Sequence, residues 1–278
     1  MTFALPDKVI LITGASGGIG AACARAFHAA GARLVLTDVT LAPVAALAAD
    51  LGAERTLALA LDVTDRAAAD TVVAEAVRRF GGIDMVFANA GIAGDPPTTI
   101  ANMDERMFEK VIEVDLLGVW RTVRACLPQI IERRGHVLIT ASIYAFMNGV
   151  INAPYAMSKA GVESFGRALR GELAGTGATA GVLYPGWVDT AIARVAFGGN
   201  ATATELVVMA FPAPLRRPIT PQTVATAVVR GVERRAARII VPRRWIPWSW
   251  FRGIMNALTD RYLDGHAGIQ AQIRKLER

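Results

Sequence analysis

The chain has 278 residues, of which 53% are hydrophobic and 19% are charged, so a mainly disordered protein is excluded. Its length fits a single large α/β domain. The two cysteines, Cys23 and Cys126, lie in helix-like stretches, so we expect a reducing, cytoplasmic location rather than a disulfide scaffold. No apolar run is long enough to span a membrane, and the first strand-like run begins too early to leave room for a signal peptide.

The formal net charge of +6 is unevenly distributed along the chain. Residues 216–278 carry 13 basic and 4 acidic side chains, a net charge of +9, whereas residues 1–215 have a net charge of −3. A nucleic-acid-binding protein would more often spread basic charge over a docking face, and no known nucleic-acid motif accompanies the basic tail. We therefore expect no nucleic-acid partner.

Short β-branched runs alternate with longer Ala-rich helical stretches. The predicted strands are 8–13, 33–37, 56–61, 84–88, 136–141, 178–184 and 238–241. The predicted helices are 18–30, 41–51, 65–80, 153–174 and 221–235, with a long helix over 104–133 that is interrupted or kinked around Gly118 and Pro128. This alternation predicts a doubly wound parallel sheet of about seven strands in a three-layer α/β/α sandwich.

The first strand runs directly into a glycine-rich turn, TGASGGIG at positions 13–20, and then into a helix. Glycines let the backbone turn tightly and approach an anion, and the helix N-terminus offers free N–H groups. The glycines at 14, 18 and 20 differ in spacing from the Gly-x-Gly-x-x-Gly pattern of other dinucleotide folds. The placement predicts a phosphate-binding turn, and the alternative is a flexible glycine turn.

The second strand ends in Asp38, 18 positions after Gly20. A carboxylate there can accept hydrogen bonds from both ribose hydroxyls of an adenosine and would repel a 2′-phosphate. Position 39 is Val and position 17 is Gly, so no cation is in place for that phosphate. The pattern favours NAD over NADP, and the alternative is a plain turn residue.

Ser142 follows the fifth strand, Tyr155 comes thirteen residues later, and Lys159 lies one helical turn beyond Tyr155 on the same face. A phenol with an ordinary pKa of about 10 is a poor base, and a neighbouring ammonium favours its phenolate form. Ser142 can hold a substrate oxygen by a hydrogen bond. Each residue alone is most often structural, but the full spacing predicts a site for proton transfer.

Together these motifs resemble the short-chain dehydrogenase/reductase family, over roughly residues 6–190 with weaker agreement to about 242. The resemblance implies a Rossmann-type fold and hydride transfer between C4 of a nicotinamide and a carbinol or carbonyl carbon, with Tyr155 moving the proton. It places Asp62 and Val63 near the adenine, and the Val188 backbone and Thr190 hydroxyl at the carboxamide. The cofactor-binding residues that it implies are Gly14, Ser16, Gly17, Gly18, Ile19, Gly20, Asp38, Asp62, Val63, Asn89, Ala90, Gly91, Tyr155, Lys159, Pro185, Gly186, Val188 and Thr190.

Three features depart from the family pattern. Asp115 replaces the Asn of the family's proton relay, so the predicted catalytic set is Ser142, Tyr155, Lys159 and Asp115. Ala88 replaces the first Asn of the common Asn-Asn-Ala-Gly segment. The usual Val-Asp-Gly-Gly ending is missing, and a tail of about 36 residues follows Pro242. Because the family's tetramer uses that ending, we expect either a homodimer or a homotetramer.

By family position, an apolar pocket is expected at Ile143, Tyr144, Met147 and Trp187, with Ile92. Residues 191–215 are expected to form a lid over the substrate, with Gly198 and Gly199 as its hinge. The apolar residues predicted to line it are Ile192, Val195, Phe197, Leu206, Val207, Val208, Met209 and Phe211. The alternative is that 206–209 is the buried face of a helix. Tyr144 lacks a lysine partner at helical spacing, so Tyr155 is preferred as the base.

The tail concentrates three tryptophans, Trp245, Trp248 and Trp250, among arginines. Interleaved aromatic and basic side chains suit a lipid interface, so one interpretation is peripheral membrane contact through residues 243–256. The other is that the aromatics pack on the sheet edge or across a dimer interface, and this is favoured. We expect residues 1–242 to form a single domain and 243–278 an extension that packs on it, on a partner subunit or on a membrane.

The sequence thus predicts an NAD-dependent oxidoreductase that interconverts a secondary alcohol and a ketone on an apolar steroid, terpenoid or lipid-like substrate. No metal site is expected. One alternative is an NADP-dependent carbonyl reductase, which Asp38 disfavours. An alternative from another class is a nucleotide-sensing binding protein without turnover, which would be expected to have lost Tyr155 or Lys159.

Overall fold

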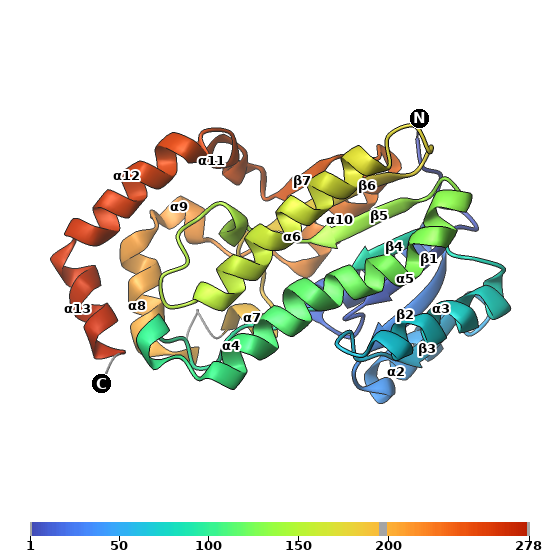
Figure 1. Ribbon diagram of the computed structural model, residues 1–278, viewed down its shortest axis with the longest axis horizontal. Coiled ribbons are helices and arrows are strands. Elements are labelled where there is room, and N and C mark those ends of the chain that lie inside the picture. Colours follow the sequence, from blue (N-terminus) through green and yellow to red (C-terminus); the bar gives the residue numbers. More distant parts are fainter. Residues whose placement is uncertain (1, 195–198, 277–278) are drawn as a thin grey trace.

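The computed structural model describes residues 2–194 and 199–276, and a seven-stranded parallel sheet lies at its centre (Figure 1). The strand order is β3-β2-β1-β4-β5-β6-β7, with every neighbouring pair parallel. The strands are β1 Val9–Thr13, β2 Arg33–Asp38, β3 Thr56–Ala60, β4 Met85–Ala88, β5 His136–Thr140, β6 Thr179–Pro185 and β7 Arg238–Val241. The order reverses direction between β1 and β4, and a crevice outside the carboxyl ends of the strands is expected there.

Two layers of helices cover the sheet, which confirms the three-layer doubly wound fold. One apolar core joins the sheet to α1 (Gly18–Ala29), α2 (Leu41–Leu51) and α10 (Pro221–Glu233). The other joins it to α3 (Arg66–Phe80), α5 (Gly118–Glu132) and α6 (Ala153–Glu172). All residues of β1 and β5 are buried, as expected for central strands covered on both faces.

The predicted long helix over 104–133 is three segments: α4 (Glu105–Ile112), a π-helical turn η2 (Glu113–Leu117) and α5. The break precedes Gly118, where an added Cβ would lie 2.6 Å from a Val63 methyl, so this approach requires glycine. The expected interruption at Pro128 is wrong, because α5 continues through it. Pro128 and Arg124, whose carbonyl loses its partner, are both exposed, so water can satisfy that carbonyl.

The C-terminal tail continues as helices beyond the end of the sheet. After η5 (Arg243–Trp245) come α11 (Ile246–Trp250), α12 (Arg252–Gly265) and α13 (Ala267–Lys275). Figure 1 shows them, in red, as an arch beside the orange helices α8 (Ala201–Ala210) and α9 (Ala213–Arg216). Leu206 of α8 packs with Leu263 and Ile269 in a small apolar cluster that joins the arch to this region.

The remaining short elements frame the carboxyl end of the sheet. They are η1 (Ile100–Asn102), η3 (Ile143–Ala145) and α7 (Ala191–Arg194). Within residues 2–194 and 199–276, no helix has both the length and the apolar character needed to cross a membrane.

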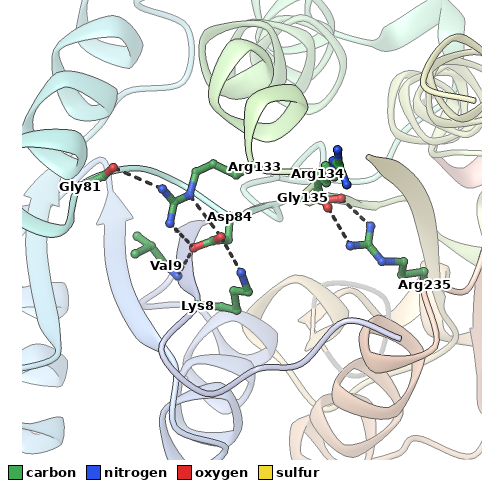
Figure 2. A network of polar contacts seen from close by, with 8 residues as sticks. All are labelled: Lys8, Val9, Gly81, Asp84, Arg133, Arg134, Gly135 and Arg235. Carbon is green, nitrogen blue, oxygen red and sulfur yellow. Dashed lines mark hydrogen bonds and ion pairs between the residues drawn. The ribbon is translucent and has the colours of Figure 1, made fainter. Parts of the chain in front are cut away.

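A network of hydrogen bonds and ion pairs connects the amino ends of the strands, opposite the carboxyl ends (Figure 2). The buried Asp84 carboxylate accepts hydrogen bonds from Lys8 Nζ at 2.9 Å, from the Val9 N–H at 3.0 Å and from Arg133 Nε at 3.2 Å. Burial alone would raise the pKa of Asp84, but these donors outweigh it and hold the pKa below its usual value. Nearby, Arg235 donates to the carbonyls of Gly135 and Arg134, both at 2.7 Å.

Candidate active site

The glycine-rich turn lies between β1 and α1, at the carboxyl end of the sheet. Gly14 has a φ of +63°, and a Cβ there would lie 2.9 Å from the Ala90 Cα. A Cβ on Gly20 would lie 2.1 Å from the Gly14 carbonyl oxygen, so the turn can close only with glycine at this position. Gly17 precedes α1 without a side-chain cap, which leaves the first N–H groups of the helix available to an anion.

Asp38 ends β2 beside this turn. Its Oδ2 accepts hydrogen bonds from the Ser16 N–H at 3.1 Å and the Ser16 hydroxyl at 2.5 Å, and its Oδ1 accepts one from the Val39 N–H. These contacts fix the carboxylate at the wall of the main cavity. The described wall residues around it, Gly14, Ser16, Gly17, Val39, Leu61 and Asp62, include no cation.

The segment after β4 ties the glycine turn to the centre of the sheet. Asn89 Nδ2 donates to the Thr13 and Gly14 carbonyls at 3.2 and 3.3 Å, while Thr140 donates to Asn89 Oδ1. The Thr13 hydroxyl accepts hydrogen bonds from the Asn89 and Ala90 N–H groups. Thr13 and Thr140 therefore stabilise this wall through their hydrogen bonds to the segment after β4. The sequence motifs did not single out either threonine.

The three residues of the predicted proton-transfer site converge on the same cavity. Ser142 precedes η3, while Tyr155 and Lys159 lie on α6. A side-chain hydrogen bond links Ser142 to Tyr155, and Lys159 Nζ lies 5.2 Å from the centre of the Tyr155 ring. Lys159 Nζ also lies 3.0 Å from Asp115 Oδ2 and 3.5 Å from the Thr140 carbonyl oxygen.

Burial and charge act in opposite directions on the Tyr155 phenol. Burial raises its pKa, Lys159 lowers it, Asp115 raises it and the hydrogen bond with Ser142 lowers it, with a net increase. The expected influence of the ammonium is present, but burial and the neighbouring carboxylate outweigh it. At neutral pH the phenol therefore carries its proton, which is the form that can donate to a carbonyl oxygen.

Asp115 lies behind this site rather than in it. It belongs to the π-helical turn η2, does not line the cavity, and accepts a hydrogen bond from the Ile92 N–H at 2.7 Å. Burial lowers the pKa of Lys159, but Asp115 and Tyr155 raise it by more than burial lowers it. The lysine therefore remains charged. Gly91 completes the enclosure, because a Cβ there would lie 3.1 Å from Asp115 Oδ2 and 3.2 Å from Lys159 Nζ. Asp115 therefore contacts Lys159 from the side away from the cavity.

An aromatic series leads from Tyr155 towards the tail. Tyr144 contacts Tyr155 edge to face at 5.7 Å between ring centres, and Trp187 at 5.9 Å. Phe211 then joins Trp187 to Trp245, which in turn contacts Trp248. Burial raises the pKa of the Tyr144 phenol, and its side chain bonds Asn152, so its surroundings differ from those of Tyr155. Trp245 is fully buried, which agrees with the packing interpretation for this tryptophan.

The main cavity has a volume of about 1100 Å³ and joins the glycine turn to the aromatic series. Every predicted cofactor and pocket residue lines it, and so does every predicted catalytic residue except Asp115. Of the apolar residues predicted to line the lid, Ile192, Leu206, Val207 and Phe211 line the cavity. Val208 and Met209 do not line it, because they lie on other sides of α8. Val195, Phe197 and Gly198 lie outside the described residues.

The sequence analysis missed part of the wall. Thr259, Tyr262 and Leu263 of α12 line the cavity, as do Arg106 and Lys110 of α4. One guanidinium nitrogen of Arg252, Nη1, donates to both carboxylate oxygens of Glu163 at 2.9 Å and holds α12 against α6. These contacts join residues about 90 or more positions apart, and no local sequence pattern signals them.

The comparisons with known proteins agree with this geometry. A family model described as "short chain dehydrogenase" matches residues 8–199. Momilactone A synthase of Oryza sativa subsp. japonica is 35% identical over 204 residues, which are 73% of this chain and 74% of the relative.

Two solved structures show the same fold. A 3-ketoacyl-(acyl-carrier-protein) reductase from Brucella melitensis complexed with NADH has 27% identity and a TM-score of 0.76, covering 85% of this chain and 97% of its own. An alcohol dehydrogenase from Thermococcus sibiricus complexed with 5-hydroxy-NADP has 27% identity and a TM-score of 0.72, covering 84% and 95%.

The chain therefore belongs to the short-chain dehydrogenase family of oxidoreductases, which act on small molecules with a nicotinamide cofactor. The residues present fit such a cofactor. The glycine turn forms a cradle that a Cβ at position 14 or 20 would fill, and the uncapped start of α1 faces the same cavity.

Proposed function

We propose that this protein is an NAD-dependent oxidoreductase that interconverts a secondary alcohol and a ketone on an apolar substrate. The observation that carries the proposal is the convergence of Ser142, Tyr155 and Lys159 on one cavity that also contains the glycine turn and Asp38. Its substrate classes are steroid, terpenoid or lipid-like alcohols and ketones.

In this mechanism Tyr155 transfers the proton, and the neighbouring side chains orient the substrate and stabilise the phenolate. Ser142, which is hydrogen-bonded to Tyr155, orients the substrate oxygen beside the phenol. When bound, the nicotinamide cofactor accepts or supplies the hydride. In reduction the protonated phenol donates to the carbonyl oxygen, and in oxidation the phenolate removes the hydroxyl proton. Lys159 stabilises that phenolate and is held in place by Asp115.

The apolar character of the substrate is inferred from the wall beyond Tyr155. Ile92, Ile143 and Met147 line it together with Trp187, Leu206, Val207 and Phe211. A cavity of about 1100 Å³ exceeds the usual range for one small ligand, so it can hold a dinucleotide and a sizeable second molecule.

Replacing Tyr155 with phenylalanine tests the reaction. Turnover with NAD across a panel of steroid, terpenoid and aliphatic secondary alcohols should fall by about 10²–10⁴-fold, while NAD binding persists. Tyr144→Phe is the matched control, because the two rings touch but only Tyr155 has a lysine partner. Undiminished turnover in Tyr155→Phe would contradict the mechanism. Tight NAD binding without turnover by the wild type would favour nucleotide sensing instead.

The preference for NAD depends on Asp38. Its carboxylate lies beside Ser16 and Val39, where no described wall residue supplies a cation for a 2′-phosphate. In Asp38→Asn we expect weaker NAD binding and a loss of discrimination against NADP by about tenfold or more, measured by fluorescence titration with both cofactors. Asp70→Asn, at an exposed position of α3 that does not line the cavity, should leave both affinities unchanged. Tighter wild-type binding of NADP would instead support the carbonyl reductase alternative.

The proposal extends to assembly and location. We place the enzyme in the cytoplasm as a homodimer or homotetramer, and the buried free thiols of Cys23 and Cys126 support a reducing compartment. Residues 1–242 form the catalytic domain in this proposal, and 243–278 the extension. Peripheral membrane contact through residues 243–256 is also proposed, supported by exposed Trp250 and Phe251, whereas Trp245 is committed to the core.

A further inference from the structure

Exposed apolar side chains follow one another along α12 and the two residues before it. Trp250 is 71% exposed, Phe251 57%, Ile254 66%, Leu258 60% and Tyr262 46%. After Trp250, the spacings of three and four residues place them on one side of the helix. We call these five residues the apolar stripe. Other exposed large apolar residues of the described chain, such as Leu41, Ile100 and Ile131, lie on separate elements.

The stripe is not the surface by which α12 attaches to the domain. That attachment uses Arg252, which bonds Glu163, and the buried Leu263 on the opposite side. At the stripe's end, the Tyr262 hydroxyl donates to the Met209 carbonyl, which fixes the ring at the cavity wall. The arch in Figure 1 lies at one end of the molecule, so α12 can meet a flat surface without obstruction from the sheet.

The charge around the stripe restricts its partner. Residues 243–276, which include the stripe, carry six basic and two acidic side chains, a net charge of +4, and the two acids, Asp260 and Asp264, belong to α12 itself. Arg261 is exposed beside Tyr262 on α12, and Arg274 and Lys275 are exposed on α13. A two-fold contact of the stripe with a second copy would bring this positive segment against itself. A surface rich in anionic headgroups complements it, and tryptophan beside arginine suits headgroup depth.

We propose that the apolar stripe docks on an anionic lipid surface. The same helix also forms part of the cavity wall, through Thr259 and Leu263 and through Tyr262, the last residue of the stripe. Docking therefore sets the substrate end of the cavity beside the bilayer, where apolar alcohols and ketones dissolve. This second part rests on the proposed oxidoreductase function, whereas docking itself deepens only the membrane contact proposed above.

Co-sedimentation with vesicles tests the docking. Wild-type protein should bind phosphatidylcholine vesicles containing phosphatidylglycerol at low salt, and should bind less as salt rises. Trp250→Ser/Ile254→Ser/Leu258→Ser should weaken binding by about tenfold or more. Leu41→Ser/Ile131→Ser, which removes exposed apolar groups elsewhere, should bind as wild type does. None of these positions lines the cavity.

Three results would overturn docking: no wild-type binding to the anionic vesicles at low salt, equal binding by the stripe variant, or a lipid-free wild-type oligomer that the stripe variant converts to monomer. The last result would show that the stripe is an interface with a second copy of the chain. Tyr155→Phe separates docking from catalysis, because it should bind vesicles normally while losing turnover.

Discussion

At the scale of single residues, the distinctive feature is the buried carboxylate of Asp115 beside Lys159, at a position where the sequence resemblance led us to expect an asparagine. Asp115 is fully buried, and its pKa is raised by burial and lowered by Lys159 and the Ile92 N–H, with a net increase. The pair costs desolvation, yet breaking it would leave an uncompensated buried ammonium. Asp115 both keeps Lys159 charged and offsets the effect of that charge on Tyr155.

Replacing Asp115 with asparagine should therefore shift the pH dependence while keeping activity. Removing the carboxylate removes an influence that raises the Tyr155 pKa, while the phenolate itself still raises the pKa of Lys159 and so favours its charged form. The phenolate therefore forms at lower pH. The acidic limb of kcat/KM for alcohol oxidation should move to lower pH, with a rate loss well short of about 10²–10⁴-fold. The measurement is a pH–rate profile with NAD. A folded but inactive variant would show that the acid itself is required.

At the scale of elements, α6 organises the site and its cover together. Tyr155, Lys159 and Glu163 follow one another at intervals of four residues, so they share one face of this helix. Two of them face the cavity, and the third carries the arch through Arg252. The substrate wall supplied by α12 is thus attached to the same helix that carries the proton-transfer residue.

Glu163→Gln should loosen α12 without disturbing the sheet. The charge-assisted pair with Arg252 is replaced by a neutral hydrogen bond, so local opening becomes easier. Amide hydrogen exchange over 252–263 should accelerate by about tenfold or more relative to the strands. Glu172→Gln, at the exposed end of α6, serves as the control. Unchanged exchange in α12 would show that apolar packing alone holds the arch.

At the scale of the whole molecule, a stabilising network and the candidate active site lie at opposite ends of the strands of one sheet. The network of Asp84, Lys8 and Arg133 fastens the amino ends of β1 and β4 (Figure 2), while the cavity opens at the carboxyl ends. Among the described residues, no hydrogen-bond partner of Asp84 lines the cavity, so changes in the network should alter the free energy of unfolding and leave the site intact.

Asp84→Asn should lower the free energy of unfolding by about 1–3 kcal/mol near neutral pH. Because folding depresses the Asp84 pKa, its contribution is present above the unfolded pKa of about 4 and is lost as pH falls through the folded value. Denaturant titrations should show the gap between wild type and variant closing in acid. Asp50→Asn should show no such gap. A gap that stays constant with pH would mean that the charge of Asp84 is not the cause.

The sequence by itself determined the doubly wound fold and the order of its elements, because strands buried on both faces leave unbroken apolar runs. It also located the residues that line the cavity near the glycine turn and α6, since these follow fixed spacings along the chain. Tertiary structure alone decided that Asp115 sits behind Lys159, that Trp245 is buried while Trp250 is exposed, and that α12 forms part of the cavity wall. Those outcomes depend on contacts between distant segments, whose packing no local periodicity records.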